Sequence, residues 1–364
     1  MLIPNTNYMQ TDAMPIPTTV TTASQLADLD LDNLQFGKVF ADHMLVIDYK
    51  DGAWQQPQIL PYGPIELSPA TAALHYGQAM FEGMKAYKTP QGKVVLFRPR
   101  DNWARMNKSA VRLCMPEIPE ELFMEGLKQL IALDADWVPQ RPGYSLYIRP
   151  FMFGSEGLLG VRPSTEYKFI IFCSPASGYY SEPVRVKIEE TYTRAVEGGF
   201  GFAKAAGNYG GSLLPAKEAH EQGFHQIIWT DGREHNYIEE SGTMNVMFVI
   251  DGKLVTPALS TSILAGITRD SVLQLARDWG VPVEERRIKV QEIVDAYHAG
   301  KLQDAFGTGT AATIAHIKSI TFRGEEMMLP PVEERQLSNK IATELDNIRY
   351  GISPDPHGWV VPVE

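Results

Sequence analysis

A single lysine stands among small and aromatic residues in the segment from 198 to 212, which reads GGFGFAKAAGNYGGS. This lysine is Lys204. Glycine and alanine leave space beside its amine, and the segment contains no acidic residue that would form a simple ion pair. An amine shielded from water is a nucleophile toward carbonyl groups, which is the chemistry of a Schiff base. The segment therefore predicts a Schiff-base lysine, although most lysines are solvated surface charges.

Two adjacent carboxylates, Glu239 and Glu240, lie in the segment YIEESGTMN from 237 to 245. A carboxylate beside the nitrogen of a pyridine ring keeps that nitrogen protonated, so that the ring accepts electrons from a substrate carbanion. The segment thus favours a pyridoxal cofactor. The alternative interpretation is that both glutamates face solvent at the end of a strand.

Hydroxyl groups lie next to small residues in two further segments, Ser241–Thr243 and Gly266–Thr268. The second segment is expected at the start of a helix that runs from Thr268 or Arg269 to Trp279. Free amides and the positive end of the helix dipole favour an anion there, so these segments suit a phosphate group. The alternative is that Thr268 only caps the helix.

The segment FGTGTAAT, residues 306–313, formally matches a dinucleotide-binding fingerprint. That fingerprint opens a helix and is followed by a distant acidic residue, whereas residues 313–322 read as a strand and Glu325 and Glu326 come too early. We therefore reject the match and expect a turn whose exposed amides hold a carboxylate. A purely structural β-turn is the alternative.

The segment SLYIRP, residues 145–150, places Tyr147 and Arg149 on one face of an expected strand, because side chains alternate along a strand. A phenol and a guanidinium on one face are suited to carboxylate recognition. An ion pair at an interface is an equally good interpretation of this pair.

The elements that must position these residues follow from the periodicity of apolar side chains. Apolar and polar residues alternate between Phe36 and Phe97, with turn signals at Asp51–Gly52 and at residues 89–92, and this pattern indicates hairpins. Helices are expected from Asp101 to about Ala110 and from Pro119 to Ile131. Strands followed by helices are typical of an α+β domain.

The second half of the chain repeats this mixture. Asp231–Gly232 and Asp251–Gly252 are favoured two-residue turns between apolar runs. Before them, the segment CSPASGYYSEP is rich in turn formers and is flanked by strand-like sequence, so we place a linker there. The predicted α+β organisation comprises an N-terminal arm (1–35), a small α+β domain (36–172), an interdomain linker (173–183) and a large α+β domain (184–364) that contains Lys204.

Composition narrows the class of protein. With 364 residues, 44% hydrophobic and 21% charged, the chain fits two globular domains and has no apolar run long enough to cross a membrane. The first 37 residues lack lysine and arginine, which fits neither a secretory signal nor a transit peptide. The two cysteines, Cys114 and Cys173, have no metal-binding spacing and form no disulfide framework. We therefore expect a cytoplasmic protein without a metal.

The net charge of −11 argues against a nucleic-acid surface, because phosphate binding needs clustered lysine and arginine. A small-molecule ligand is expected instead. A few buried donors can still hold an anionic ligand against the overall charge.

Several segments together closely resemble the branched-chain amino acid aminotransferases, which belong to the fold type IV group of pyridoxal-phosphate enzymes. The likeness extends from about Phe36 to the C-terminus. The strongest matches are FGKVFADHML, LHYGQAMFEGMKAY, LFRPRDNWARMNKSAVRLCMP, SLYIRP, FAKAAGNYGGS, IEESGTMNVMF, LAGITRD and FGTGTAA. The resemblance implies the two-domain fold type IV architecture, which periodicity alone does not provide.

The resemblance also implies roles for individual residues. Lys204 is expected to be the Schiff-base lysine and general base, Glu240 the partner of the pyridine nitrogen, and Tyr209 the group near the phenolic oxygen of pyridoxal 5'-phosphate. The other expected cofactor-binding residues are Arg105, Gly242, Thr243, Gly266, Ile267, Thr268 and Thr310. The expected substrate-binding residues are Phe36, Tyr76, Phe81, Tyr147, Arg149, Val161, Tyr179, Thr310 and Ala311.

The implied reaction is a ping-pong transamination between L-leucine, L-isoleucine or L-valine and 2-oxoglutarate, which yields the branched-chain 2-oxo acid and L-glutamate. A homodimer is implied, in which Tyr76 and residues 159–161 reach into the site of the partner subunit. Ala312 and Ala315 stand where animal members have a Cys-x-x-Cys, so thiol-based redox control is not expected.

Three alternatives remain at this point. A D-amino-acid aminotransferase and an aminodeoxychorismate lyase share the lysine and glutamate segments. From another class, a non-catalytic protein that binds small anions would keep the phosphate turns.

Overall fold

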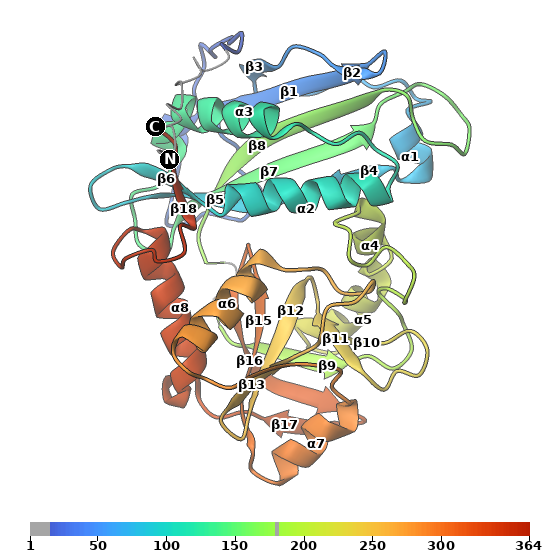
Figure 1. The fold of residues 1–364 in the computed structure, drawn as a ribbon, viewed down its shortest axis with the longest axis vertical. Coiled ribbons are helices and arrows are strands. Elements are labelled where there is room, and N and C mark those ends of the chain that lie inside the picture. Colours follow the sequence, from blue (N-terminus) through green and yellow to red (C-terminus); the bar gives the residue numbers. More distant parts are fainter. Residues whose placement is uncertain (1–14, 179–181) are drawn as a thin grey trace, which may run out of the picture.

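Two nine-stranded sheets organise the residues that the computed structural model describes, which are 15–178 and 182–364 (Figure 1). The first sheet consists of β1 (His43–Lys50), β2 (Ala53–Trp54), β3 (Gln58–Pro61), β4 (Ala79–Phe81), β5 (Met84–Lys88), β6 (Val94–Phe97), β7 (Ser145–Gly154), β8 (Tyr167–Ala176) and β18 (Val360–Pro362). Its main path is β18-β6-β5-β7-β8-β1-β2, with β3 on β1 and β4 on β7.

The second sheet contains the other strands. These are β9 (Val184–Ile188), β10 (Gln226–Thr230), β11 (Ile238–Ser241), β12 (Met244–Ile250), β13 (Lys253–Thr256), β14 (Val283–Glu285), β15 (Leu302–Gly309), β16 (Thr313–Phe322) and β17 (Glu325–Met328). Its order is β11-β10-β9-β16-β15-β12-β13-β14, and β17 pairs with β16. Because β11 also pairs with β12, part of this sheet closes on itself like a barrel.

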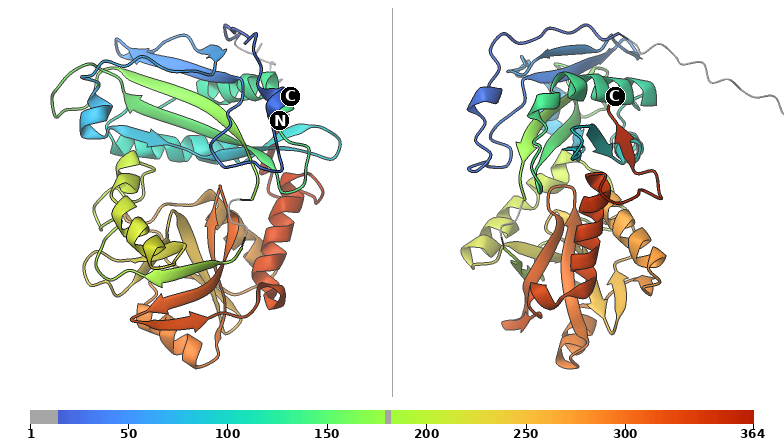
Figure 2. Two further views of the ribbon diagram at one scale, coloured as in Figure 1. Left: turned by 180° about the vertical axis from the view of Figure 1, so that it is seen from behind. Right: turned by 90° about the vertical axis from the view of Figure 1, so that its left-hand side faces the viewer.

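Helices pack around both sheets (Figures 1 and 2). The α-helices are α1 (Ala72–Tyr76), α2 (Pro99–Arg112), α3 (Glu120–Leu133), α4 (Ala206–Gly210), α5 (Leu213–Glu221), α6 (Ile267–Asp278), α7 (Val290–His298) and α8 (Gln336–Arg349). Short 3-10 helices occupy Leu26–Asp28, Ala135–Trp137 and Val332–Glu334. None of the helices in the described residues is long and apolar enough to cross a membrane.

The core of the first sheet forms where α3 packs on β1. Phe123, Leu127, Leu130 and Ile131 lie on one face of α3 and are fully buried, as their helical spacing predicts. Gly126 permits the close approach, since a Cβ at this position would lie only 2.5 Å from Leu45 Cδ2. The second sheet has its own core, in which β12 is buried over almost its whole length.

Several expected elements are confirmed. The helix α2 extends two residues beyond the predicted range at each end, and α3 begins one residue later and ends two residues later than predicted. The turn at Asp51–Gly52 joins β1 to β2 and that at Asp251–Gly252 joins β12 to β13, with positive φ at both residues of each turn, as two-residue hairpins require. Residues 313–322 form β16, so the rejected dinucleotide fingerprint does not open a helix.

The predicted two-residue turn at Asp231–Gly232 is wrong. The pairing of Thr230 with Ile238 leaves a loop of residues 231–237 between β10 and β11. The Asp231 carboxylate accepts hydrogen bonds from four backbone N–H groups of this loop, at residues 233, 234, 236 and 237. An aspartate can therefore organise a longer loop as well as a tight turn.

Residues 173–176, which were assigned to the linker, are the last residues of β8 and pair with β7. The pairing of β8 with β1 ends at Phe172. Pro175 therefore has no neighbouring strand on the β1 side. Because of this, the N–H group that proline lacks leaves no hydrogen bond of the sheet unformed. The predicted domain boundaries otherwise stay a prediction, and residues 360–362 pair with β6 of the first sheet although they follow the second sheet in sequence.

Candidate active site

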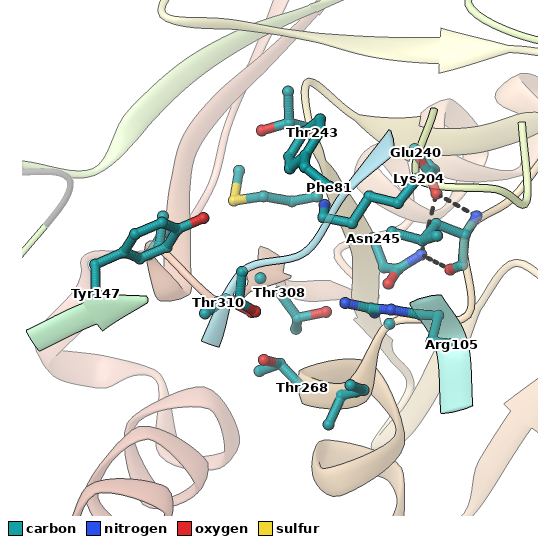
Figure 3. A pocket seen from close by; sticks show the side chains of 18 of the residues that line it. Phe81, Arg105, Tyr147, Lys204, Glu240, Thr243, Asn245, Thr268, Thr308 and Thr310 are labelled. Carbon is teal, nitrogen blue, oxygen red and sulfur yellow. Dashed lines mark hydrogen bonds between the residues drawn. The ribbon is translucent and has the colours of Figure 1, made fainter. Parts of the chain in front are cut away.

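A cavity of about 440 Å³ lies where the two sheets face each other, and it collects most of the expected site residues (Figure 3). The expected residues that line it are Phe36, Phe81, Arg105, Tyr147, Arg149, Lys204, Tyr209, Glu240, Thr243, Gly266, Ile267, Thr268, Thr310 and Ala311. The lining residues that we did not expect are Gly83, Met244, Asn245, Leu264, Thr308, Gly309 and Ala312. Residues far apart in the chain therefore share one cavity.

Lys204 lies just before α4, and its backbone is bound to α2 and to the first sheet. Its N–H donates to Ser109 Oγ at 3.0 Å, and its carbonyl accepts a hydrogen bond from Phe81 N at 3.1 Å. The amine Nζ donates to the Tyr209 hydroxyl at 2.9 Å and lies 4.8 Å from the centre of the Phe81 ring. The backbone bonds and the phenol together hold the amine at the cavity.

Glu240, on β11, is 3% exposed and lines the same cavity as Lys204. Its Oε1 accepts hydrogen bonds from Leu264 N at 2.8 Å and Asn245 Nδ2 at 3.3 Å, and its Oε2 pairs with Arg194 Nη2 at 3.0 Å. Burial raises the pKa of Glu240, and the charge of Arg194 opposes that rise. Arg194, which we did not expect, compensates this buried carboxylate.

The side chain of the neighbouring Glu239 does not enter this cavity. It is 8% exposed, accepts a hydrogen bond from Ser262 Oγ, and is absent from the lining of the 440 Å³ cavity. The interpretation that Glu239 and Glu240 face solvent is wrong, because both side chains are buried. Strand alternation turns only Glu240 toward the lysine.

Donor groups gather at another end of the cavity. Arg105 extends from α2, and Ile267 and Thr268 form the first turn of α6 (Figure 3). Gly266 is the N-cap residue of α6, which has no side-chain cap hydrogen bond, so the interpretation of Thr268 as the cap is wrong. The free N–H groups and the dipole of α6 provide a site for an anion.

Two glycines around the cavity allow close packing of its walls. A Cβ on Gly266 would overlap Asn245 Oδ1, and a Cβ on Gly242 would overlap Gln226 Oε1. Gly242, with a φ of +59°, forms the turn between β11 and β12. It lines a smaller hollow beside Lys204 and Tyr209 and not the main cavity.

The turn after β15 closes a third side of the cavity. Thr310 Oγ1 donates to the Gly83 carbonyl at 3.0 Å, and the Ala311 carbonyl accepts a hydrogen bond from Lys85 Nζ at 2.9 Å. Lys85 is buried, and burial lowers its pKa to about 7. These contacts fix the turn to the first sheet.

Aromatic residues form the remaining wall. Tyr147 and Arg149 share one face of β7 as predicted, and Arg149 Nη2 donates to the Tyr147 hydroxyl at 3.0 Å. The Arg149 guanidinium also lies over the Phe81 ring, 4.5 Å from its centre. Phe36 meets Tyr147 edge to face, with 5.0 Å between ring centres. The wall is thus apolar with one cationic group.

The remaining expected residues lie elsewhere. Tyr76 is 42% exposed, Leu159 is 65% exposed and Val161 is 90% exposed, and they do not line the described cavity. Tyr179 lies outside the described residues. The role assigned to these residues across a subunit interface stays a prediction.

Sequence reasoning missed a buried carboxylate beside Arg105. Glu82 is fully buried and receives two hydrogen bonds from the Arg105 guanidinium, both of 2.8 Å. Glu82 lies within the segment LHYGQAMFEGMKAY, which contributed to the resemblance, but nothing in that segment indicates its partner.

The cavity fits pyridoxal 5'-phosphate. An amine, a carboxylate and a cluster of anion-binding donors lie around one space, which are the groups needed by an aldehyde, a pyridine nitrogen and a phosphate. Thr308 Oγ1, from a lining residue, is buried and has no hydrogen-bond partner in the described part of the chain. Such an unpaired polar atom is expected where a bound group completes the site.

Comparisons with known proteins agree with this fit. A family model described as amino-transferase class IV matches residues 79–320. A probable branched-chain-amino-acid aminotransferase of Staphylococcus epidermidis is 49% identical over 92% of this chain and 94% of that protein.

Solved structures are similar over nearly the same length. The branched-chain aminotransferase from Thermoproteus uzoniensis with norvaline has a TM-score of 0.72 and 27% identity, over 88% of this chain and all (100%) of that one. The branched-chain amino acid aminotransferase from Thermobaculum terrenum, in its PLP form, has a TM-score of 0.70 and 26% identity, over 88% of this chain and 98% of that one. Their fold is the fold type IV architecture seen here.

Proposed function

Because this chain belongs to the class IV aminotransferases, we propose that it exchanges an amino group between L-leucine, L-isoleucine or L-valine and 2-oxoglutarate. The products are the branched-chain 2-oxo acid and L-glutamate, and the two half-reactions give ping-pong kinetics. One observation supports the proposal above all: the cavity places an amine and a buried carboxylate beside an apolar wall that includes a single guanidinium. The name of the Staphylococcus epidermidis relative points to branched-chain amino acids as well.

Pyridoxal 5'-phosphate supplies a carbonyl carbon that bonds amino groups and a ring that withdraws electrons from the substrate α-carbon. Lys204 would hold that carbonyl carbon, Glu240 the ring nitrogen and Tyr209 the phenolic oxygen. When its amine is free, Lys204 Nζ takes the proton from the α-carbon of the substrate as a general base. The Tyr209 hydroxyl, 2.9 Å away, keeps this amine oriented.

The donor cluster would hold the phosphate. Arg105 provides guanidinium N–H groups, and Ile267 and Thr268 provide the amides at the start of α6. The Thr243 hydroxyl completes the set, with Gly242 and Gly266 allowing the backbone to turn close to it. Thr310 is also expected beside the phosphate, but its hydroxyl already donates its one proton to the Gly83 carbonyl.

The substrate fits the opposite side. The amides of Thr310 and Ala311 would bind the α-carboxylate of the substrate. Lys85 stabilises this turn through its hydrogen bond to the Ala311 carbonyl. Phe36, Phe81 and Tyr147 offer an apolar surface to a branched side chain, whereas Arg149 can pair with the distal carboxylate of glutamate. Tyr179 remains an expected pocket residue.

A homodimer is part of the proposal. Tyr76, Leu159 and Val161 expose apolar side chains that a second copy would cover, and the expected contribution of residues 159–161 to the partner's site needs this assembly. Light scattering of the purified protein should give twice the mass of one chain. A cytoplasmic location stays a prediction.

One experiment tests the cofactor and the reaction together. The purified protein should absorb near the edge of the visible range, and borohydride should remove the band while adding the mass of the cofactor to the peptide that contains Lys204. Activity should then be compared among L-leucine, D-amino acids and aminodeoxychorismate. The readout is glutamate formed from 2-oxoglutarate for the amino acids, and pyruvate release for aminodeoxychorismate. Activity confined to D-amino acids or aminodeoxychorismate would overturn the proposed substrates, and absence of the band would favour a non-catalytic anion-binding protein.

A further inference from the structure

The Arg105 guanidinium is bound by the carboxylate of Glu82, which is 0% exposed. Arg105 Nε donates to Glu82 Oε1 at 2.8 Å, and Arg105 Nη2 donates to Glu82 Oε2 at 2.8 Å. This bidentate arrangement matches the planar fork of the guanidinium to the two oxygens. It fixes both the position and the plane of the arginine.

Glu82 is itself fixed on two sides. Its Oε2 accepts hydrogen bonds from Asn102 Nδ2 at 2.8 Å and from Gly83 N at 3.1 Å. Asn102 is 2% exposed and lies on α2, one turn before Arg105. The carboxylate therefore links the chain between β4 and β5 to the helix that presents the arginine.

The Arg105 guanidinium has N–H groups left over for a ligand. Arginine has five N–H donors. Two bind Glu82, and a third, on Nη1, donates to the Ala265 carbonyl at 3.1 Å. One N–H on Nη1 and one on Nη2 remain for other partners, and Arg105 lines the cavity (Figure 3).

The charge of Arg105 and the burial of Glu82 together determine whether the Glu82 carboxyl is ionised. Burial alone would raise the pKa of Glu82, but the Arg105 charge and its hydrogen bonds outweigh that effect and lower the pKa. Glu82 is therefore ionised at neutral pH, and Arg105 acts in the cavity chiefly through directed donors rather than an unbalanced positive charge.

We propose that Glu82 is a positioning residue that aims the two remaining N–H groups of Arg105 at the phosphate of the cofactor. This inference rests on the proposed role of Arg105 at that phosphate. The competing explanation is that Glu82 only stabilises the fold by joining α2 to the first sheet. The two explanations predict different losses of ligand affinity when Glu82 is replaced. A positioning role predicts a loss only for a ligand that has a phosphate group, whereas a role in the fold predicts the same loss for a ligand without one.

The test compares two ligands, pyridoxal 5'-phosphate and pyridoxal, which lacks the phosphate. Their dissociation constants should be measured by fluorescence on the full chain after removal of the cofactor, for Glu82→Gln, Arg105→Gln and the double variant. Glu82→Gln should weaken binding of pyridoxal 5'-phosphate about ten-fold or more, as expected for a lost charge-assisted hydrogen bond, and leave pyridoxal binding within about two-fold. The double variant should be no weaker than Arg105→Gln alone.

A matched control comes from a second buried ion pair. Asp304 and Arg335, which pair at 3.1 Å and are both at most 4% exposed at their side chains, do not line the cavity. Asp304→Asn should lower the melting temperature without changing the ratio of the two dissociation constants. If Glu82→Gln does not fold, Asn102→Ala removes one donor from Glu82 and should produce a smaller change with the same dependence on phosphate.

The outcomes separate the two proposals. Equal losses for both ligands in Glu82→Gln, or additive losses in the double variant, would overturn the positioning role. Glu82→Gln could bind pyridoxal 5'-phosphate normally while Arg105→Gln binds it more weakly. This result would also overturn the positioning role of Glu82, but it would leave the proposed role of Arg105 intact. Unchanged affinity in Arg105→Gln would instead contradict the proposed function of that residue.

Discussion

Lys204 Nζ and the Tyr209 hydroxyl lie 2.9 Å apart, although Lys204 precedes the short helix α4 and Tyr209 lies within it. The helix α4 turns the phenol back toward the amine that precedes it. The same lysine is tied to β4 through its carbonyl, so the first sheet and α4 fix it from two directions. A flexible side chain thus acquires a defined position at the cavity.

Replacement of Lys204 by alanine should lower turnover by several orders of magnitude, because the nucleophile and the general base are lost together. The variant should still fold and bind the cofactor through its phosphate. Absorbance spectra and transaminase assays with L-leucine check this prediction, and Lys93→Met, at an exposed position, provides the control. Near-normal turnover in Lys204→Ala would contradict the central assignment.

Glu240→Gln should reduce kcat by roughly 100-fold, the scale of a disturbed proton transfer, because a neutral amide does not hold a proton on the ring nitrogen. The amide oxygen keeps a possible acceptor for Leu264 N, so the fold should tolerate the change. Glu239→Gln is the control, since that side chain bonds to Ser262 and does not line the cavity. Greater sensitivity at Glu239 would show that the roles of the two glutamates are reversed.

Arg149→Met should separate the two substrates. The variant keeps the apolar stem and removes the charge that the distal carboxylate of glutamate needs. We expect a loss in kcat/KM of about 2–4 kcal/mol for glutamate and 2-oxoglutarate, with a much smaller change in the leucine half-reaction measured by single turnover. Equal losses for both substrates would mean that Arg149 supports the fold or binds the α-carboxylate.

Lys85 should make the free energy of unfolding depend on pH above neutrality. Burial lowers its pKa from 10.5 to about 7 in the folded chain, so the unfolded chain binds more protons between these two values. Stability should therefore rise with pH in this window relative to Lys85→Met, by up to about 1.4 kcal/mol per pH unit. Urea unfolding at several pH values measures the difference, with Lys93→Met as the control. Parallel curves for wild type and Lys85→Met would exclude this linkage.

The sequence allowed prediction of features that depend on neighbouring residues. The apolar spacing of α3, the paired positive-φ residues at Asp251–Gly252 and the alternation at Tyr147 and Arg149 each reflect local geometry. The resemblance then supplied the two-domain architecture and most of the residues that line the cavity. The three local features can each be judged from a short stretch of chain, whereas the resemblance needs many segments in order.

Other features depend on contacts between distant segments. Arg194, in the loop after β9, meets Glu240 on β11 of the same sheet, and Lys85 on β5 of the first sheet meets the Ala311 carbonyl in the turn after β15. No spacing in the sequence relates these partners. The seven-residue loop after β10 escaped prediction for another reason, since the hydrogen bonds of Asp231 outweigh the preference of Asp-Gly for a tight turn.

The pairing of β18 with β6 has a consequence for synthesis of the chain on the ribosome. Residues 360–362 complete the edge of a sheet whose other strands have all emerged by residue 176. Until then β6 presents an open edge, and Arg98 lacks both the hydrogen bond of its N–H to the Trp359 carbonyl and the contact of its guanidinium with that indole ring. A first sheet that forms before residues 360–362 are synthesised therefore offers the edge of β6 to neighbouring chains.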